Sequence, residues 1–234
     1  FQSQEGEWDS NGQVLWAFGR FAAMTGEALP EDWLHAIERG VRWIRRKRMS
    51  GEAGEGLAGL LPAGFSAEHL GPNDYYYWDD WWAVSGLRAA ARVLQQQGRY
   101  RAGRRAREEA DSLRASIDES LATIPRSRCG GAIPAAPGRR MDAGAIGSLV
   151  ADYPLHETAP GDHGIMATVE YLVRHSFHDG GFFQNMIHSG INAYLTLDIA
   201  QTLLRAGQAH RAWALIRRVA ELASPTGQWP EAIH

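Results

Sequence analysis

The sequence of 234 residues predicts an all-α protein, and three observations support this prediction. Apolar residues recur at three- and four-residue spacing along much of the chain, as they do in amphipathic helices. Runs of alternating β-branched residues, which would indicate strands, are nearly absent. Glycine or proline stands at the end of several periodic segments, for example at Pro125 and Gly207, and both residue types are common where helices stop.

The first half of the chain contains four of these periodic segments. The first has a weak apolar stripe, whereas the other three have a clear stripe along one face. In the second segment, arginines stand between the apolar positions, which indicates a solvated outer face. The segments span residues 10–24, 31–49, 80–98 and 104–124, and their stripes include Ile37, Val41 and Ile44, then Leu87, Ala91 and Leu94, and then Leu113, Ile117 and Leu121.

The second half of the chain contains four more periodic segments, so that we expect about eight helices in all. Two of these segments are short and weakly periodic, and the last two have strong apolar stripes. The segments span residues 143–151, 162–175, 188–206 and 208–223, and the last two stripes include Ile191, Leu195 and Ile199, and then Ala212, Leu215 and Val219.

Short turns join two pairs of these helices. Gly98 and Gly207 each separate two helices, and a connection this short implies an antiparallel helical hairpin. Longer segments rich in glycine, proline and aromatic residues lie between the hairpins, and loops of that length usually carry function. We therefore expect a closed ring of helices with a site at one mouth, in a single domain over residues 1–234. The long segments are residues 50–79, 125–142, 152–161 and 176–187.

Composition and charge argue against several classes of function. A formal net charge of -3 disfavours a nucleic-acid binder held by phosphate contacts. The single cysteine, Cys129, cannot form an intrachain disulfide, and the histidines have no recognised metal-ligand spacing, so we expect no metal or cofactor. No apolar run approaches the roughly 20 residues that span a bilayer. The first ten residues are polar and acidic and show no signal peptide, so we expect a cytoplasmic location.

Residues 71–82 form the densest cluster of chemically useful side chains, with three carboxylates among six aromatic rings where a helix begins. Sugar rings stack on aromatic side chains, and sugar hydroxyls suit carboxylates. A carboxyl group among tryptophans also has a raised pKa, as a general acid requires. The alternative is that Asp79 or Asp80 caps the helix and the aromatic rings form core, but capping accounts for only one aspartate. The candidate sugar-site residues are Asp74, Trp78, Asp79, Asp80 and Trp81.

A second cluster, at residues 225–234, contains Glu231 behind a Trp-Pro pair. Taken alone, Glu231 resembles an ordinary glutamate of a surface loop. Inverting glycoside hydrolysis, however, needs two carboxyl groups roughly 6.5–9.5 Å apart on opposite sides of the sugar. Loop residues far apart in sequence can face each other across a ring of hairpins. We therefore expect Asp79 to act as the general acid and Glu231 as the general base, with Trp229 contacting the sugar.

A third group consists of Gln184, His188 and Asn192, which recur every four residues. They would share one helix face if the helix expected at 188–206 began early. Gln184 and His188 could then bind sugar hydroxyls. The group could equally consist of a helix cap and a buried core histidine, and the sequence leaves both interpretations open.

These motifs resemble those of the glucoamylase-type glycoside hydrolases, which fold as an (α/α)6 toroid, and of their trehalase and processing-glucosidase relatives. The segment Trp78-Asp79-Asp80 is similar to the Trp-Glu-Glu segment of glucoamylases, whose first acid is the general acid, and to the Gly-Trp-Asp segment of trehalases. Residues 230–234 resemble the segment that supplies the glucoamylase base. The stretch beginning at Asp9 resembles an Asp-x-x-Gly stretch that holds sugar hydroxyls, which makes Asp9 a further candidate for substrate binding.

The resemblance implies an inverting glycoside hydrolase that acts on α-glucosides or related oligosaccharides without a cofactor. It also implies the middle-to-C-terminal part of the barrel, because a closed toroid has twelve helices and about eight are expected here. A homo-oligomer or another chain could complete the ring. Three alternatives remain open: a sugar epimerase in which His188 transfers protons, a phosphorolytic enzyme on a similar toroid, and a non-catalytic carbohydrate-binding helical module.

Overall fold

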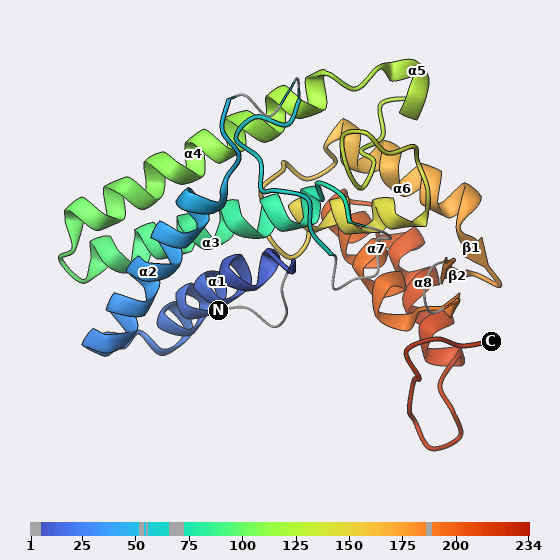
Figure 1. Ribbon diagram of the computed structural model, residues 1–234. Coiled ribbons are helices and arrows are strands. Elements are labelled where there is room, and N and C mark those ends of the chain that lie inside the picture. The colour runs from blue at the N-terminus through green and yellow to red at the C-terminus, as the bar shows by residue number, and fades with distance from the viewer. Residues whose placement is uncertain (1–5, 52–53, 55, 66–72, 186–188) are drawn as a thin grey trace. The chain divides into compact units, whose positions relative to one another are not determined.

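The computed structural model describes residues 6–51, 54, 56–65, 73–185 and 189–234, and its elements are mostly helices (Figure 1). The prediction of an all-α protein is confirmed. The helices are α1 (Asp9–Thr25), α2 (Glu31–Lys47), α3 (Tyr77–Gln96), α4 (Tyr100–Ala122), α5 (Arg126–Cys129), the 3-10 helix η1 (Ala143–Ala151), α6 (His163–His175), α7 (Ala193–Arg205) and α8 (Ala209–Glu221). The strands are β1 (Phe177–His178), β2 (Gly181–Gln184) and β3 (Gly190–Ile191).

Contacts within the chain divide it into two compact units. The first unit contains α1 to α4, and the second contains α5 to α8 together with the strands. The expectation of a single domain stays a prediction, and each unit is described by itself. Among the described residues, no helix is both long and apolar enough to cross a membrane.

Helix α3 is the centre of the first unit and lies between α1 and α4 (Figure 1). Small residues such as Ala83, Ala90 and Ala91 alternate with larger apolar ones along α3, and most of the helix is buried. The predicted hairpin of α3 and α4 is confirmed: the two helices are joined at Gly98, whose φ of 77° lies in the left-handed region that glycine tolerates best.

Helices α1 and α3 approach each other so closely that their backbones touch. A Cβ atom added at Gly12 would lie 2.4 Å from the carbonyl carbon of Trp82, and one added at Gly86 would lie 2.4 Å from the carbonyl oxygen of Gly12. These distances are far below van der Waals contact, so only glycine fits at either position. The close approach brings the first turn of α1 beside the first turn of α3, where the predicted acidic residues lie.

The second unit contains the other predicted hairpin, in which α7 and α8 are joined at Gly207. The prediction that a helix begins at residue 188 is wrong, because the side chain of Asn192 caps α7 at the backbone N–H of Leu195. Gly190 and Ile191 belong instead to β3, in a three-stranded antiparallel sheet of order β1-β2-β3. This sheet could not be predicted from the sequence, because strands of two to four residues are too short to show an alternating pattern.

Candidate active site

Asp79 lies in the first turn of α3 and is only 1% exposed. Among the described residues, neither of its carboxyl oxygens has a regular hydrogen-bond partner. This is unusual, because buried polar atoms in folded proteins are nearly always hydrogen-bonded. A buried carboxyl group without partners is best accommodated in its protonated, neutral form.

Asp9 begins α1 and holds the two helix starts together. Its Oδ2 atom accepts one hydrogen bond of 2.8 Å from Trp78 Nε1 and another of 2.8 Å from Gln13 Nε2. The bond from Trp78 links α1 to α3, and the bond from Gln13 closes the first turn of α1. Asp9 is itself buried. The carboxyl of Asp9 is therefore fixed in place beside Asp79.

Three carboxyl groups near Asp79 shape its acidity. Burial raises the pKa of Asp79 well above its ordinary value of 3.8, and the negative charges of Asp9, Asp80 and Glu7 raise it further. The backbone amide of Asp9 opposes this increase, although its geometry falls short of a regular hydrogen bond. Burial also raises the pKa of Asp9, and the hydrogen bond from Trp78 partly offsets that effect. The cluster keeps a proton on Asp79 at a pH where an ordinary aspartate has lost it.

Aromatic rings line one side of this acidic cluster. The rings of Trp78 and Trp82 meet edge to face with centroids 5.8 Å apart, and Trp82 meets Trp16 of α1 in the same way at 5.7 Å. Trp78 is partly exposed, so one portion of its ring remains available for contact. Trp16 and Gln13 are not among the site residues predicted from the sequence. Gln13 follows Asp9 by four residues, and this helical spacing is the signal that could have identified it.

Three other predicted site residues of the first unit have structural partners instead. Trp81 is buried, and its ring lies under the guanidinium of Arg114 of α4, with 4.8 Å between the guanidinium carbon and the ring centroid. The Oδ1 atom of Asp80 accepts a 2.8 Å hydrogen bond from the amide of Leu61. Asp74 accepts one from the amide of Tyr75, also at 2.8 Å. Substrate contacts by these three residues stay predictions, and their surroundings favour structural roles.

In the second unit, Glu231 is exposed and lies close to a backbone pairing that fixes its segment. The amide of Ile191 donates to the carbonyl of Ile233 at 2.9 Å, and the reverse bond is 3.0 Å long. Trp229 is 46% exposed, and its Nε1 donates a 2.7 Å hydrogen bond to the carbonyl of Val219 in α8. The pairing of Glu231 with Asp79 across a shared substrate stays a prediction.

The expected helix face formed by Gln184, His188 and Asn192 does not exist, since Gln184 lies in β2 and Asn192 precedes α7. Gln184 and Asn192 nevertheless meet, because the antiparallel pairing of β2 and β3 brings them together. Asn192 Nδ2 donates a 3.1 Å hydrogen bond to Gln184 Oε1, and both side chains are buried. His188 lies outside the described residues, so its role and the sugar contact of Gln184 stay predictions.

The chain matches no protein-family model, and no curated protein matches it either. Solved structures do match. A glycosidase variant has a TM-score of 0.64 at 19% identity, and the match covers 97% of this chain and 56% of the glycosidase. Another variant of a glycosidase, solved in complex with glucose, has the same scores. A bacterial glucoamylase solved in complex with acarbose has a TM-score of 0.70 at 14% identity, with 97% of this chain and 36% of the glucoamylase covered.

At these identities the likeness shows the fold alone. The chain spans about half the length of the glycosidases, and about a third of the glucoamylase. Both kinds of match extend over nearly all of the chain, and they confirm the predicted resemblance in fold. The protein therefore has the helical fold of a segment of the glucoamylase-like glycosidases.

Proposed function

We propose that the protein is a glycoside hydrolase, and that it cleaves α-glucosides or related oligosaccharides with inversion of configuration. One observation carries this proposal: Asp79 is a buried carboxyl group whose pKa is raised well above 3.8, next to a partly exposed tryptophan. A general acid must hold its proton near neutral pH and deliver it to the leaving oxygen. The fold adds support, because the solved structures that share it include glycosidases and a glucoamylase.

In this proposal Asp79 protonates the glycosidic oxygen as the bond to the anomeric carbon breaks. The resulting carboxylate is then stabilised less well than in water, since burial and the charge of Asp9 both disfavour it. This instability keeps the proton on Asp79 until a substrate accepts it, and it favours reprotonation of Asp79 after the reaction. Asp79 is shielded from solvent, so a substrate can contact it only if neighbouring side chains move aside.

Glu231 is proposed as the general base that removes a proton from the attacking water. Its exposed position suits this role, because the base of an inverting enzyme must reach the attacking water. The backbone pairing of Ile233 with Ile191 holds the segment that carries it. Trp78 and Trp229 offer exposed ring surface on which sugar faces could stack.

The test measures hydrolysis of maltose, trehalose and kojibiose by the wild type and by two variants, Asp79→Asn and Glu231→Gln. Each substitution removes the proton-transfer group and preserves side-chain size, so we expect at least about a hundredfold loss of turnover from each. Glu119→Gln, an exposed site on α4, is the matched control and should retain full turnover. Near-wild-type turnover by either site variant would contradict the assignment of that residue.

The same reactions also separate the proposed function from its alternatives. Proton NMR of the first product identifies the anomer, and inversion predicts the β anomer from an α-linked substrate. Sugar 1-phosphate formed only when inorganic phosphate is present would indicate phosphorolysis instead. Isomer formation from a free monosaccharide would indicate an epimerase. Calorimetric binding of the disaccharides without any turnover would indicate a binding module.

A further inference from the structure

Asp80, which follows Asp79 in α3, has its own set of contacts, and these contacts connect Asp80 to the start of α1. We propose that Asp80 is a positioning residue of the proposed active site, which acts through residues 57–65 to hold Asp9 in place beside Asp79. This inference rests on the proposed function for its catalytic consequence. Its structural part, the coupling of Asp80 to the start of α1, can be tested without any activity.

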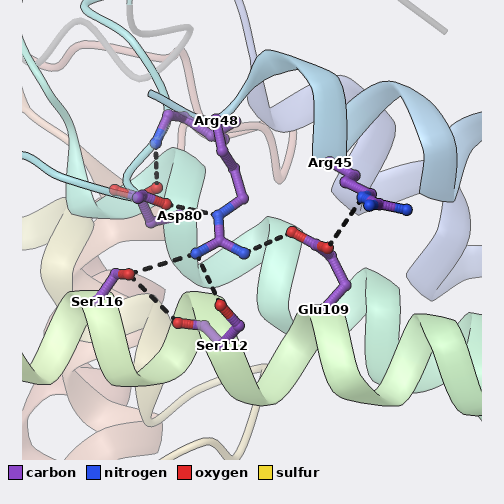
Figure 2. Close-up of polar contacts among 8 residues, drawn as sticks. Arg45, Arg48, Asp80, Glu109, Ser112 and Ser116 are labelled. Carbon is purple, nitrogen blue, oxygen red and sulfur yellow. Dashed lines mark hydrogen bonds and ion pairs between the residues drawn. The ribbon is translucent and has the colours of Figure 1, made fainter. Parts of the chain in front are cut away.

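The first contact in this chain joins Asp80 to Leu61. Asp80 is 0% exposed, and its Oδ1 atom accepts the 2.8 Å hydrogen bond from the Leu61 amide (Figure 2). Leu61 and its neighbour Leu60 are also buried. A sugar hydroxyl therefore cannot reach Asp80 without displacing the backbone that it binds. Burial raises the pKa of Asp80 to about 8, although the Leu61 amide and the positive charge of Arg48 lower it.

Arg48, which directly follows α2, connects the same segment to α4. Its guanidinium donates to the carbonyl of Gly59 at 2.6 Å, to Ser112 at 3.2 Å and to Ser116 at 3.3 Å, and it pairs with Glu109 at 2.5 Å (Figure 2). Arg48 and Glu109 are both largely buried, so this pair is worth more than an exposed ion pair. The start of the segment is thus fixed to α4, and its middle is fixed to α3 through Asp80.

The far end of the segment contacts the residues that lead into α1. Trp8 Nε1 donates a 3.2 Å hydrogen bond to the carbonyl of Ala63, and the amide of Phe65 donates a 2.9 Å bond to the carbonyl of Gly6. Gly64 pairs with Asp74 in an isolated antiparallel bridge. Trp8 directly precedes Asp9. The position of Asp9 therefore depends on residues 63–65, which in turn depend on the hydrogen bond between Leu61 and Asp80.

Two substitutions separate this role from a direct catalytic one. Asp80→Asn retains an oxygen that can accept from the Leu61 amide but cannot ionise. Asp80→Ala leaves the Leu61 amide unsatisfied in a buried place, which is costly. We expect Asp80→Ala to lower kcat at least about tenfold, and Asp80→Asn to restore most of that loss. Equal losses in the two variants would overturn the proposal, because they would show that Asp80 acts through its charge or its proton.

A third substitution breaks the same chain of contacts without touching Asp80. Trp8→Phe removes the hydrogen bond to Ala63 and keeps most of the ring. Because the charge of Asp9 raises the pKa of Asp79, displacement of Asp9 should move the basic limb of the kcat/KM profile to lower pH. We expect this shift in Trp8→Phe, and a larger shift in Asp80→Ala than in Asp80→Asn. An unmoved basic limb in Trp8→Phe would contradict the coupling.

A double-mutant cycle tests whether Asp80 acts through Asp9. If it does, Asp80→Ala should have little further effect on kcat in an Asp9→Asn background. Additive losses would indicate that Asp80 supports the site by another route and would overturn the proposal. Loss of general stability alone predicts additivity, so the cycle distinguishes positioning from a merely structural effect.

Hydrogen exchange measured by mass spectrometry gives a readout that needs no substrate. Asp80→Ala should speed exchange in peptides from residues 57–65 and from residues 6–15, whereas Glu119→Gln should change neither. Unchanged exchange in residues 6–15 would overturn the coupling of Asp80 to α1. If exchange changes as expected but no glycoside is cleaved by the wild type, the proposed function fails and the coupling stands.

Discussion

Replacement of Gly12 by alanine tests the close contact of α1 and α3 on which the candidate site depends. The added methyl group would lie 2.4 Å from both the carbonyl carbon and the carbonyl oxygen of Trp82, and 2.6 Å from the amide nitrogen of Ala83. All three atoms belong to the backbone of α3, so no side chain can rotate to make room. The two helices must therefore move apart, at the turn where Asp9 binds Trp78.

The size of the effect follows from two opposing contributions. Alanine is favoured over glycine inside a helix by about 1 kcal/mol. Carbon atoms in contact normally lie about 3.5–4.0 Å apart, so the helices must separate by about 1 Å or more. Overpacking of this kind costs about 1–3 kcal/mol, and more when rigid backbone must move. We expect a net loss of about 2 kcal/mol, which for a chain of this size lowers the Tm by about 4–8 °C.

Thermal unfolding followed by circular dichroism measures this loss, and the kinetic assay with maltose measures its effect on the site. Ala17→Gly is the control, because Ala17 is exposed on α1, and its replacement should cost only the helix-propensity difference of about 1 kcal/mol. The expected result is that Gly12→Ala loses both stability and turnover, whereas Ala17→Gly loses a little stability alone. A Tm of Gly12→Ala equal to or above that of the wild type would refute the close contact.

Two further predictions concern carboxyl groups of the second unit, one partly buried and one fully buried. Burial raises the pKa of Asp198 from 3.8 to about 7, so ionisation of this carboxyl group destabilises the fold as the pH rises from about 4 through 7. At pH 8, Asp198→Asn should therefore be more stable than the wild type by up to about 4 kcal/mol. At pH 4 the substitution should give no gain in stability. Equal Tm differences at both pH values would contradict this. Asp152 is 1% exposed and forms an ion pair with Arg205 at 3.0 Å. Arg205→Met leaves this carboxylate buried without its partner, so it should lower the free energy of unfolding in urea by about 3–5 kcal/mol. Adding Asp152→Asn to this variant should recover part of the loss. A decrease of less than about 1 kcal/mol in the free energy of unfolding would show that this ion pair is not needed for stability.

The sequence predicted the helices well because their apolar periodicity is strong. Helix α2 was expected at residues 31–49 and spans Glu31–Lys47, and η1 was expected at 143–151 and spans Ala143–Ala151, although as a 3-10 helix. Both hairpin turns fall at the predicted glycines. The start of α7 was predicted too early, since the apolar pattern continues through β3 without a break. Periodicity alone could not separate a short buried strand from the first turn of a helix.

The candidate site was less predictable, because α3 is buried on nearly every side. An amphipathic helix reveals which residues face the core, but α3 has apolar residues all around and no such signal. The sequence therefore could not show that Trp78 points to the acidic cluster while Trp81 packs under Arg114. For the same reason it could not show that Asp79 meets the start of α1 whereas Asp80 binds the backbone at Leu61. Their environments differ because adjacent residues of a helix point about 100° apart.

Because of this angular difference, two separate contacts fix the rotation of α3 about its own axis. One carboxyl group, Asp79, meets the start of α1, and its neighbour, Asp80, meets the backbone at Leu61. A small roll of α3 would withdraw one of them as it pressed the other inward, so neither contact could improve without cost to the second. Sequence changes anywhere along the buried length of α3 can produce such a roll. Substitutions at distant positions of α3 should therefore change the pKa of Asp79, as should substitutions of the residues that contact it.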